Sequence, residues 1–472
     1  MKKIKSLSLF AILGVVALSS CGKANFDNKT DNTKTTDVTT VVPTTVTTQT
    51  TPAVKDTFEL IFEDGALTGI ELTNPKRVTF DEIVVPDSVN GKPITSITTS
   101  FFYKFYCMEN PSIKKLVIGK NVSSMDLRYY GMPGVESVEI DPLNETFKIT
   151  NNNYITSLDG KQLYRAFNVT SISIPEGVET LNEGCIRDLG INTLDVPASV
   201  TWINGDISGG SLTSVTLHEG LTTLGRDAFY TDNLDELYIP ASVTNIADNM
   251  GRNIKKYVVD SNNKKYDSRN DCGCVIWTEI NRLVKVGKNY TIPSTVKDVA
   301  ASAFSYSFDF TSITIPSTVE TIDYNAFLLA YDAEHISLPS TIVLRNYGLA
   351  TTDIGTLISG CRKLKSFIIP DTVESLNKNA FYDVKVLENL YVPKLTSINE
   401  DSFSYLVSLK NIFINMTKAE WEALNYVDTS NRLENVTMYF KASSSAEVDA
   451  STENLFYRTD SSFYTKDGSF SL

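Results

Sequence analysis

The sequence offers few residues for acid–base chemistry, because only two histidines occur among its 472 residues. His335 has Glu334 beside it, and the two could form a general base held by a carboxylate. A solvated histidine at the edge of a strand is the simpler interpretation. His218 falls in a turn, where a polar residue needs no further role. Catalysis that depends on histidine is therefore weakly represented.

Glycosidic chemistry is harder to exclude, because it needs only two carboxylates placed about 5 to 10 Å apart. Glu139 and Asp195 both occupy strand positions that point outward, but on strands that are not neighbours. A solvated acidic face is the ordinary explanation for them. The sequence also lacks the HExxH, GxSxG, GxGxxG, P-loop and CxxC motifs. We therefore expect no catalytic residues and no enzyme activity.

Five cysteines follow Cys21, an odd number that does not make a disulfide framework. Cys272 and Cys274 would project to one side of an extended segment and could contact a metal. Two thiolates without a nearby histidine make an incomplete site, however. We expect buried or partly buried thiols, with a strained local disulfide as the alternative, and neither a metal nor a cofactor.

The first 20 residues have the form of an export signal, with lysines followed by an apolar run from Leu7 to Leu18. The sequence Leu-Ser-Ser-Cys that ends at Cys21 resembles the bacterial lipobox, which implies lipid attachment at Cys21 and a membrane anchor of diacylglycerol and palmitate type. Two acyl chains would make that anchor stable. An ordinary cleaved signal with an incidental cysteine is the alternative. No other stretch approaches the roughly 20 apolar residues of a spanning helix.

Residues 21–55 read as a lipidated cysteine followed by a stalk, with twelve threonines between Thr30 and Thr51 and no apolar period. At about 3 Å per residue, the stalk would hold the next domain up to roughly 100 Å from the membrane. The whole chain has a formal net charge of -13. Such an acidic protein repels phosphate backbones, so we expect no nucleic-acid partner.

One fifteen-residue phrase recurs from about residue 80 onward and is complete at residues 313–327, ITIPSTVETIDYNAF. Eight prolines mark the copies, and His218 takes the proline position of one more. Most neighbouring marks are 21 to 23 residues apart, within the period of leucine-rich repeats. Alternating apolar residues predict a short strand that the proline ends, since it has no N–H group and fixes φ.

Val319, Ile322 and Phe327 supply further inward side chains as the chain turns back. One coil cannot bury these side chains without a neighbour, so the coils must stack. We therefore predict a β-rich repeat solenoid, built from leucine-rich-repeat coils of about 22–23 residues. Each coil should contain short parallel β-strands, turns and short helical or 3-10 segments.

The phrase resembles the BspA-type leucine-rich repeat of bacterial surface proteins over nearly all of residues 58–440. Residues 87–97 (DSVNGKPITSI) are similar to the opening coil of that family, residues 266–272 (YDSRNDC) to its hairpin insertion, and residues 417–421 (TKAEW) to its closing segment. The resemblance implies a solenoid over residues 56–440 with hairpin insertions near 141–165 and 260–286. These two segments match each other at Asn144/Asn263 and Phe147/Tyr266. Residues 441–472 depart from the pattern as a C-terminal tail.

The middle residue of each strand should face outward, and stacking should align these residues into a column across the coils. The column is polar in its middle, while Ile368, Tyr391 and Phe413 at its C-terminal end would form an exposed apolar ladder about 5 Å apart. We predict that these three residues, with Tyr238 as a lone aromatic, bind a ligand. Two alternatives are that aromatic residues simply suit strands, and that the C-terminal tail covers the ladder.

These features favour a surface protein, lipid-anchored to the membrane of a bacterial cell through Cys21, that binds an extracellular protein or a glycan. The resemblance to BspA-type proteins implies the same, including an adhesin-like role toward host matrix proteins. Two alternatives remain. An enzyme acting on polysaccharide would need a carboxylate pair in a groove, and a structural scaffold would use the ladder for self-association.

Overall fold

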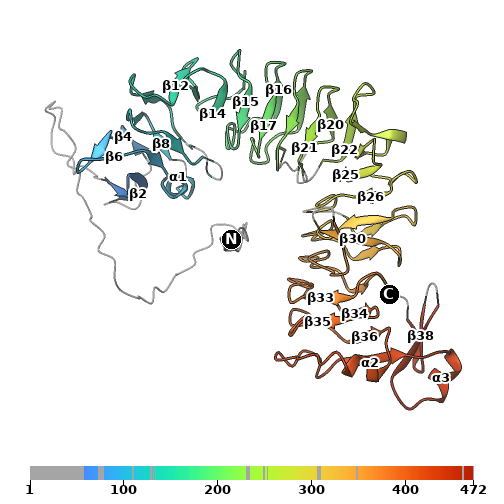
Figure 1. The fold of residues 1–472 in the computed structure, drawn as a ribbon. Coiled ribbons are helices and arrows are strands. Elements are labelled where there is room, and N and C mark those ends of the chain that lie inside the picture. The colour runs from blue at the N-terminus through green and yellow to red at the C-terminus, as the bar shows by residue number, and fades with distance from the viewer. Residues whose placement is uncertain are drawn as a thin grey trace, which may run out of the picture.

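The computed structural model describes residues 58–470, apart from 73–78, 109–110, 128–129, 131, 133, 230–233, 248–249, 252–253, 306–309, 347–348 and 460–461. The predicted signal peptide (1–20), the lipid-attachment residue Cys21 and the stalk (21–55) lie outside the described residues. The described chain is one solenoid that bends into a hook (Figure 1). None of its helices is long and apolar enough to span a membrane.

Two rows of short parallel strands run along the solenoid, and most coils add one strand to each row. The first row, which precedes the prolines, contains β4 (Ile83–Val85), β9 (Leu116–Ile118), β11 (Val138–Ile140), β16 (Thr193–Val196), β18 (Ser214–Leu217), β20 (Glu236–Ile239), β22 (Lys256–Val259), β27 (Ser312–Thr314), β29 (His335–Ser337), β32 (Ser366–Ile368), β34 (Asn389–Val392), β36 (Asn411–Ile414) and β37 (Thr437–Lys441).

The second row follows the proline turn and contains β7 (Ser96–Ile97), β10 (Ser124–Met125), β15 (Thr180–Asn182), β17 (Trp202–Asn204), β19 (Thr223–Leu224), β21 (Asn245–Ile246), β26 (Asp298–Val299), β28 (Thr321–Asp323), β30 (Val343–Asn346), β33 (Ser375–Leu376) and β35 (Ser397–Ile398). Smaller pairs lie beside the rows: β3 (Thr79–Phe80) with β8 (Ser112–Ile113), β5 (Ser88–Val89) with β6 (Lys92–Pro93), and β31 (Leu349–Thr351) with β30.

The coil of residues 313–327 shows how the phrase builds the fold. Its apolar residues Ile313, Val319 and Ile322 are buried, as the alternation predicts. After the strand, the Pro316 carbonyl accepts a hydrogen bond from the Val319 N–H (3.0 Å), which turns the chain toward the second row. Burying each such aliphatic side chain contributes about 1.5 to 3 kcal/mol.

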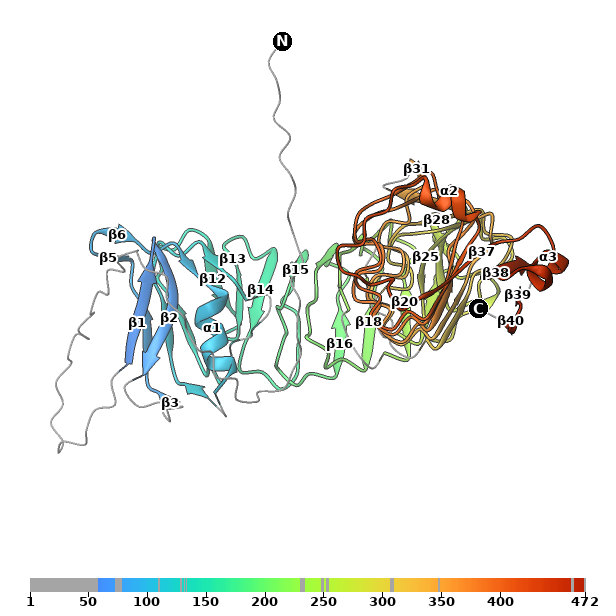
Figure 2. The same cartoon turned by 90° about the horizontal axis from the view of Figure 1, so that it is seen from below.

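The segment after the second strand row forms hydrogen-bonded turns in most of the described coils, where the sequence predicts short helical or 3-10 segments. The exception is α1 (Thr99–Tyr106), an α-helix that follows β7. Its inner side chains, Phe101, Phe102 and Phe105, are buried. Figures 1 and 2 both place α1 on the inner side of the hook.

Two antiparallel insertions interrupt the repeat, each joined to the second row by its last strand. The first is β12 (Phe147–Thr150), β13 (Tyr154–Ser157) and β14 (Gln162–Ala166); the second is β23 (Tyr266–Asp267), a 3-10 helix (Arg269–Asp271), β24 (Cys274–Trp277) and β25 (Arg282–Val286). β14 pairs in parallel with β15, and β25 pairs in parallel with β26. The insertions therefore continue the solenoid.

The matching asparagines explain why the two insertions resemble each other. The Asn144 amide N–H₂ donates to the carbonyls of Gly119 (3.0 Å) and Val122 (2.8 Å) in the preceding coil, while its oxygen accepts from the N–H groups of Thr146 and Phe147. Asn263 makes the corresponding four bonds in the second insertion. One side chain thus satisfies four backbone groups that no strand would pair.

A second shared feature of the insertions is a buried cation at the fourth position of the last strand. Arg165 donates to the carbonyls of Gly184 and Arg187, at 2.5 Å each, in the turn of the next coil. Lys285 donates to the Ser302 carbonyl at 3.2 Å in the equivalent turn. Burial lowers the pKa of Arg165 to about 10, which leaves it charged at neutral pH. Each cation ties its insertion to the coil that follows.

Non-repeating elements close both ends of the solenoid. At the N-terminal end, β1 (Phe58–Glu63) and β2 (Ala66–Leu72) form an antiparallel pair, and β2 joins β7. The C-terminal end carries α2 (Lys418–Glu422), α3 (Ser445–Ala450), β38 (Leu455–Arg458), β39 (Phe463–Thr465) and β40 (Gly468–Phe470). These elements shield the apolar side chains that a neighbouring coil would otherwise cover.

Replacing Asn144 by alanine is expected to lower the free energy of unfolding by roughly 3 kcal/mol, because its four hydrogen bonds to backbone groups are lost. Urea unfolding and amide hydrogen exchange across residues 116–166 would measure the loss. The control is Asn192→Ala, at an exposed position. Equal stability of the two variants would contradict the role assigned to Asn144.

Candidate functional site

The outward residues of the first strand row form the column that the alternation predicts, and we call this surface the strand face. Neighbouring strands pair in register there: Asp195 with Thr216, Tyr238 with Val258, Thr314 with Ser337, Ile368 with Tyr391, and Tyr391 in turn with Phe413. Since the strands are parallel, each pair lies side by side on one surface. The side chains along the strand face could therefore contact one partner together.

The prediction of an exposed apolar ladder at the C-terminal end of this column is wrong. Tyr391 is 1% exposed, Phe413 is fully buried and Ile368 is partly buried. Phe456 of β38 and Phe463 of β39 lie over them, with ring centroids 5.4 Å apart for Tyr391–Phe463 and 5.6 Å for Phe413–Phe456. Tyr439 stacks on Phe413 at 4.9 Å. The alternative interpretation holds: the C-terminal tail covers the ladder.

Polar contacts hold the tail in place beside these rings. The Arg458 guanidinium lies 4.4 Å from the ring centroid of Tyr391 and 3.5 Å from the carboxylate of Asp371. The Tyr391 hydroxyl donates to Asp371 at 2.8 Å. Burial, followed by the charge of Asp371, raises the pKa of Tyr391, so the phenol stays neutral. A ligand could reach Tyr391 and Phe413 only after the tail had moved.

Tyr238, the fourth predicted binding residue, is 39% exposed on the strand face. Its hydroxyl donates to Asp260 of the next coil. This bond raises the pKa of Tyr238 to about 12 and lowers the pKa of Asp260. Nearby, the imidazole of His218, which follows β18, lies 2.7 Å from the carboxylate of Asp195 on the preceding strand β16. The middle of the strand face therefore presents one aromatic ring among paired polar groups.

The strand-face carboxylates of the sequence-based hypothesis are not brought together. Glu139 is an exposed residue that forms an ion pair with Lys115 at 2.8 Å, while Asp195 contacts His218. His335 is exposed at the start of β29, as the solvated-edge interpretation predicts. The described residues contain no group of three histidine, cysteine or acidic side chains that could hold a metal.

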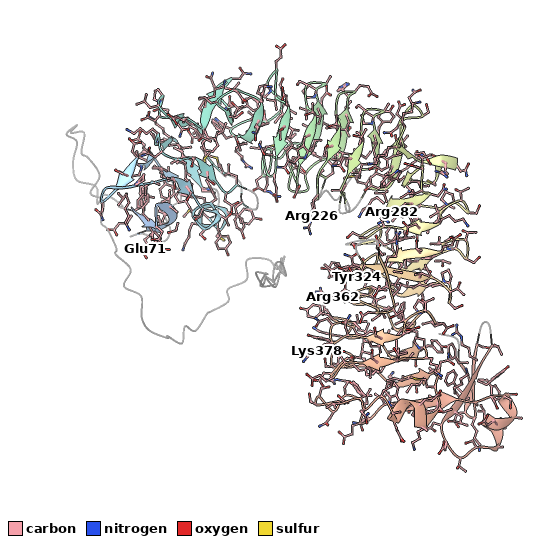
Figure 3. All side chains as sticks on the ribbon, in the orientation of Figure 1. Glu71, Arg226, Arg282, Tyr324, Arg362 and Lys378 are labelled. Atoms are coloured by element: carbon pink, nitrogen blue, oxygen red, sulfur yellow. The ribbon has the colours of Figure 1, made fainter. Side chains whose placement is uncertain are left out.

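A different pair of carboxylates does meet, in the second strand row near the bend of the hook. Asp298 on β26 and Asp323 on β28 are nearly buried, and Arg282 and Arg345 contact both of them; Figure 3 labels Arg282 in this region. Arg282 lies 2.7 Å from Asp298, and Thr321 also donates to Asp298 at 2.6 Å. Two guanidinium groups balance two carboxylates here. This arrangement joins four strands, and both arginines engage each carboxylate.

The thiols follow the sequence-based expectation with one exception. Cys185, Cys272, Cys274 and Cys361 are free and buried. A hydrogen bond between the paired thiols lowers the pKa of Cys272 and raises that of Cys274. Cys107 is exposed instead, because it follows the last turn of α1. The alternative of a disulfide between Cys272 and Cys274 is not what the structure has.

A second exposed surface lies on the inner side of the hook and was missed in the sequence. Tyr103 and Tyr106 project from α1 at 46% and 49% exposure, and the ring of Tyr130 lies 4.9 Å and 5.2 Å from theirs. The signal was the spacing of three residues between Tyr103 and Tyr106, which puts both on one helical face. Farther along the chain, Figure 3 shows Arg226, Arg362 and Lys378 on the same side of the hook.

The sequence matches a family model described as the BspA type leucine rich repeat region, in six copies over residues 142–258, 285–358 and 351–447. These matches cover more than half of the chain. The chain belongs to the BspA-type leucine-rich repeat family. No curated protein sequence matches the chain.

Several solved structures are similar to the chain. A leucine rich cell surface protein from Faecalibacterium prausnitzii A2-165 shares 20% identity, with 81% of this chain and 99% of that one covered and a TM-score of 0.48. The pneumococcal vaccine antigen PcpA shares 16% identity, with 87% and 98% covered and a TM-score of 0.44. A leucine-rich repeat protein from Eubacterium ventriosum ATCC 27560 shares 18% identity, with 76% and 88% covered and a TM-score of 0.36.

Replacing Phe463 by alanine is expected to loosen the tail and uncover Tyr391 and Phe413, at a cost of about 3 to 5 kcal/mol in local stability. Binding of a hydrophobic dye should rise, and proteolysis should begin within residues 441–470. The control is Tyr457→Ala, because Tyr457 is partly exposed and points away from Phe456 along the same strand. Unchanged dye binding and proteolysis in F463A would show that Phe463 does not secure the tail.

Proposed function

We propose that this protein is an adhesin-like surface lipoprotein whose strand face binds an extracellular protein. The observation that carries the proposal is the in-register alignment of exposed side chains around Tyr238, on a solenoid of a surface-protein family. Tyrosine is enriched in protein interfaces because it combines a large apolar ring with a hydroxyl group. The bond to Asp260 orders this ring in advance, which reduces the entropy cost of binding.

Charge and shape support a protein partner on this face. Asp195, His218 and Glu219 lie near Tyr238, and the Glu219 carboxylate accepts from the backbone N–H groups of Ala241 and Ser242 at 2.9 and 3.0 Å. Fixed charges on a flat sheet suit complementary charges on another protein. A partner of the host matrix type would contact several coils at once, so its affinity would come from many residues.

The anchor is proposed from the sequence of residues 1–21. Lipid attachment at Cys21 would hold the protein at the bacterial surface, with the threonine-rich stalk extending the solenoid away from it. This arrangement suits capture of large extracellular ligands, because the solenoid would clear the molecules that cover a membrane.

The two competing functions have less support. An enzyme acting on polysaccharide requires an acid and a base or nucleophile in a groove, whereas Asp298 and Asp323 are neutralised by two arginines. A scaffold that self-associates through Ile368, Tyr391 and Phe413 requires these residues to be exposed, whereas the tail covers them. We therefore propose binding without catalysis.

Replacing Tyr238 by alanine is expected to weaken binding of a matrix protein by about tenfold, since an interface tyrosine typically contributes more than 1 kcal/mol. Residues 56–472, produced as a soluble protein, would be titrated against immobilised fibronectin, fibrinogen, laminin and collagen near physiological salt. Salt limits non-specific attraction of this acidic protein. A matched control is Tyr464→Ala, another partly exposed tyrosine whose hydroxyl donates to an aspartate.

Saturable binding that Y238A weakens and Y464A preserves would support the strand face as the binding site. Equal binding by all three proteins would place the protein site elsewhere. Absence of binding to every matrix protein would contradict the proposed function.

Replacing Cys21 by serine is expected to move the full-length protein from the membrane fraction to the culture medium, because no acyl chain can be attached. Metabolic labelling with palmitate should mark the wild type alone. Ser20→Ala serves as the control, since it keeps the thiol. Membrane retention of C21S would show that another segment anchors the protein.

A further inference from the structure

The strongest unassigned feature is the aromatic cluster on the inner side of the hook, formed by Tyr103, Tyr106 and Tyr130, which we call the tyrosine platform. The three rings are tilted toward one another at 52° and 49°, with Tyr130 between the other two. Tyr103 and Tyr106 are each about half exposed. Contiguous apolar surface of this kind is uncommon on a soluble protein unless it binds something.

Packing of α1 does not explain the platform. The helix is fixed by the buried side chains of Phe101, Phe102 and Phe105; the Phe101 ring packs edge to face with Phe102 at 5.3 Å and with Phe105 at 5.1 Å. Tyr103 and Tyr106 are not part of this cluster: their rings contact Tyr130, and both side chains remain about half exposed. Polar residues at these two positions would serve an exposed helix equally well. The exposed part of the two tyrosine rings is therefore available to another molecule.

The chemistry of the platform indicates an uncharged ligand. Lys104 is the only charged residue of α1, and the helix contains no carboxylate. The chain as a whole carries a net charge of -13, which repels anionic polymers. Aromatic rings with hydroxyl groups match the carbohydrate surface, since the C–H face of a sugar packs on a ring while its hydroxyls exchange hydrogen bonds with the phenols. We propose that the tyrosine platform binds a neutral polysaccharide.

A second set of aromatic residues supports this assignment, because it adjoins Arg362, which lies on the inner side in the other limb of the hook. The Arg362 guanidinium lies 4.7 Å above the ring of Tyr331 and donates to Asp383 at 2.7 Å, and Figure 3 shows Arg362 on the inner side. Tyr382 and Tyr405 pack edge to face at 5.1 Å. Rings with a paired arginine and aspartate can stack on sugars and hydrogen-bond to their hydroxyl groups.

The glycan site is distinct from the strand face around Tyr238, so it stands whether or not that face binds a protein. Both surfaces together would let one molecule bridge a glycan layer and a protein.

The test is binding of residues 56–472 to neutral polysaccharides, measured by affinity electrophoresis and by pull-down on cellulose, chitin, xylan, starch and β-glucan. The double variant Y103A/Y106A is expected to bind at least about tenfold more weakly than the wild type. Trp202→Ala is the matched control, because Trp202 is an exposed aromatic (42%) on β17, outside the platform. Circular dichroism and thermal unfolding would confirm that Y103A/Y106A is folded.

A second variant, Y103L/Y106L, separates sugar stacking from general hydrophobic contact. Leucines keep apolar surface but offer no flat ring, so this variant should also lose glycan binding. Three results would overturn the proposal: no polysaccharide binds the wild type, Y103A/Y106A binds as well as the wild type, or Y103L/Y106L retains full binding. Loss of matrix-protein binding in Y103A/Y106A, with no glycan bound, would instead assign the platform to a protein partner.

Discussion

The structure depends on one constraint: no coil can bury its own inward side chains. Ile313, Val319 and Ile322 become core residues because the coils on either side supply the missing contacts and the strand partners. Each coil is therefore stabilised by the coils on either side of it. Wherever the repeat is interrupted, another element must replace the missing coil. The two insertions and the two closing ends are such replacements, and Asn144, Asn263, Arg165 and Lys285 act at the points where they join the array.

Much of this could be predicted from the sequence, because each coil of a repeat packs against coils with the same sequence pattern. Alternation placed Asp195, Tyr238 and Thr314 outward, and a period near 22 residues aligned them in register. The burial of Tyr391 and Phe413 could not be predicted in the same way. Their cover comes from residues 441–470, which carry no repeat, and only tertiary packing shows that Phe456 and Phe463 lie over the column. The tyrosine platform could not be predicted either, because Tyr130 contacts α1 only in the folded chain.

The buried ion pairs contribute more to the alignment of the coils than to net stability. Arg282 and Arg345 with Asp298 and Asp323 add little net stability, because removing four charges from water offsets much of their attraction. Any other alignment of these coils would leave a charge unpaired in the interior, which costs far more. The cluster therefore specifies the alignment of coils near the bend, on which the positions of the two limbs of the hook depend. Those limbs carry the aromatic residues of the inner side.

The fit of the tail against Tyr391 and Phe413 has an evolutionary consequence. Repeat arrays change length by gaining or losing whole units, and most internal coils here meet neighbours of nearly the same shape. The last three coils are different, because β32, β34 and β36 carry the matching surface for Phe456 and Phe463 on their outer side. A duplication or deletion that separated them from the tail would expose a large apolar surface. We therefore expect the final coils to be inherited together with the segment that covers them.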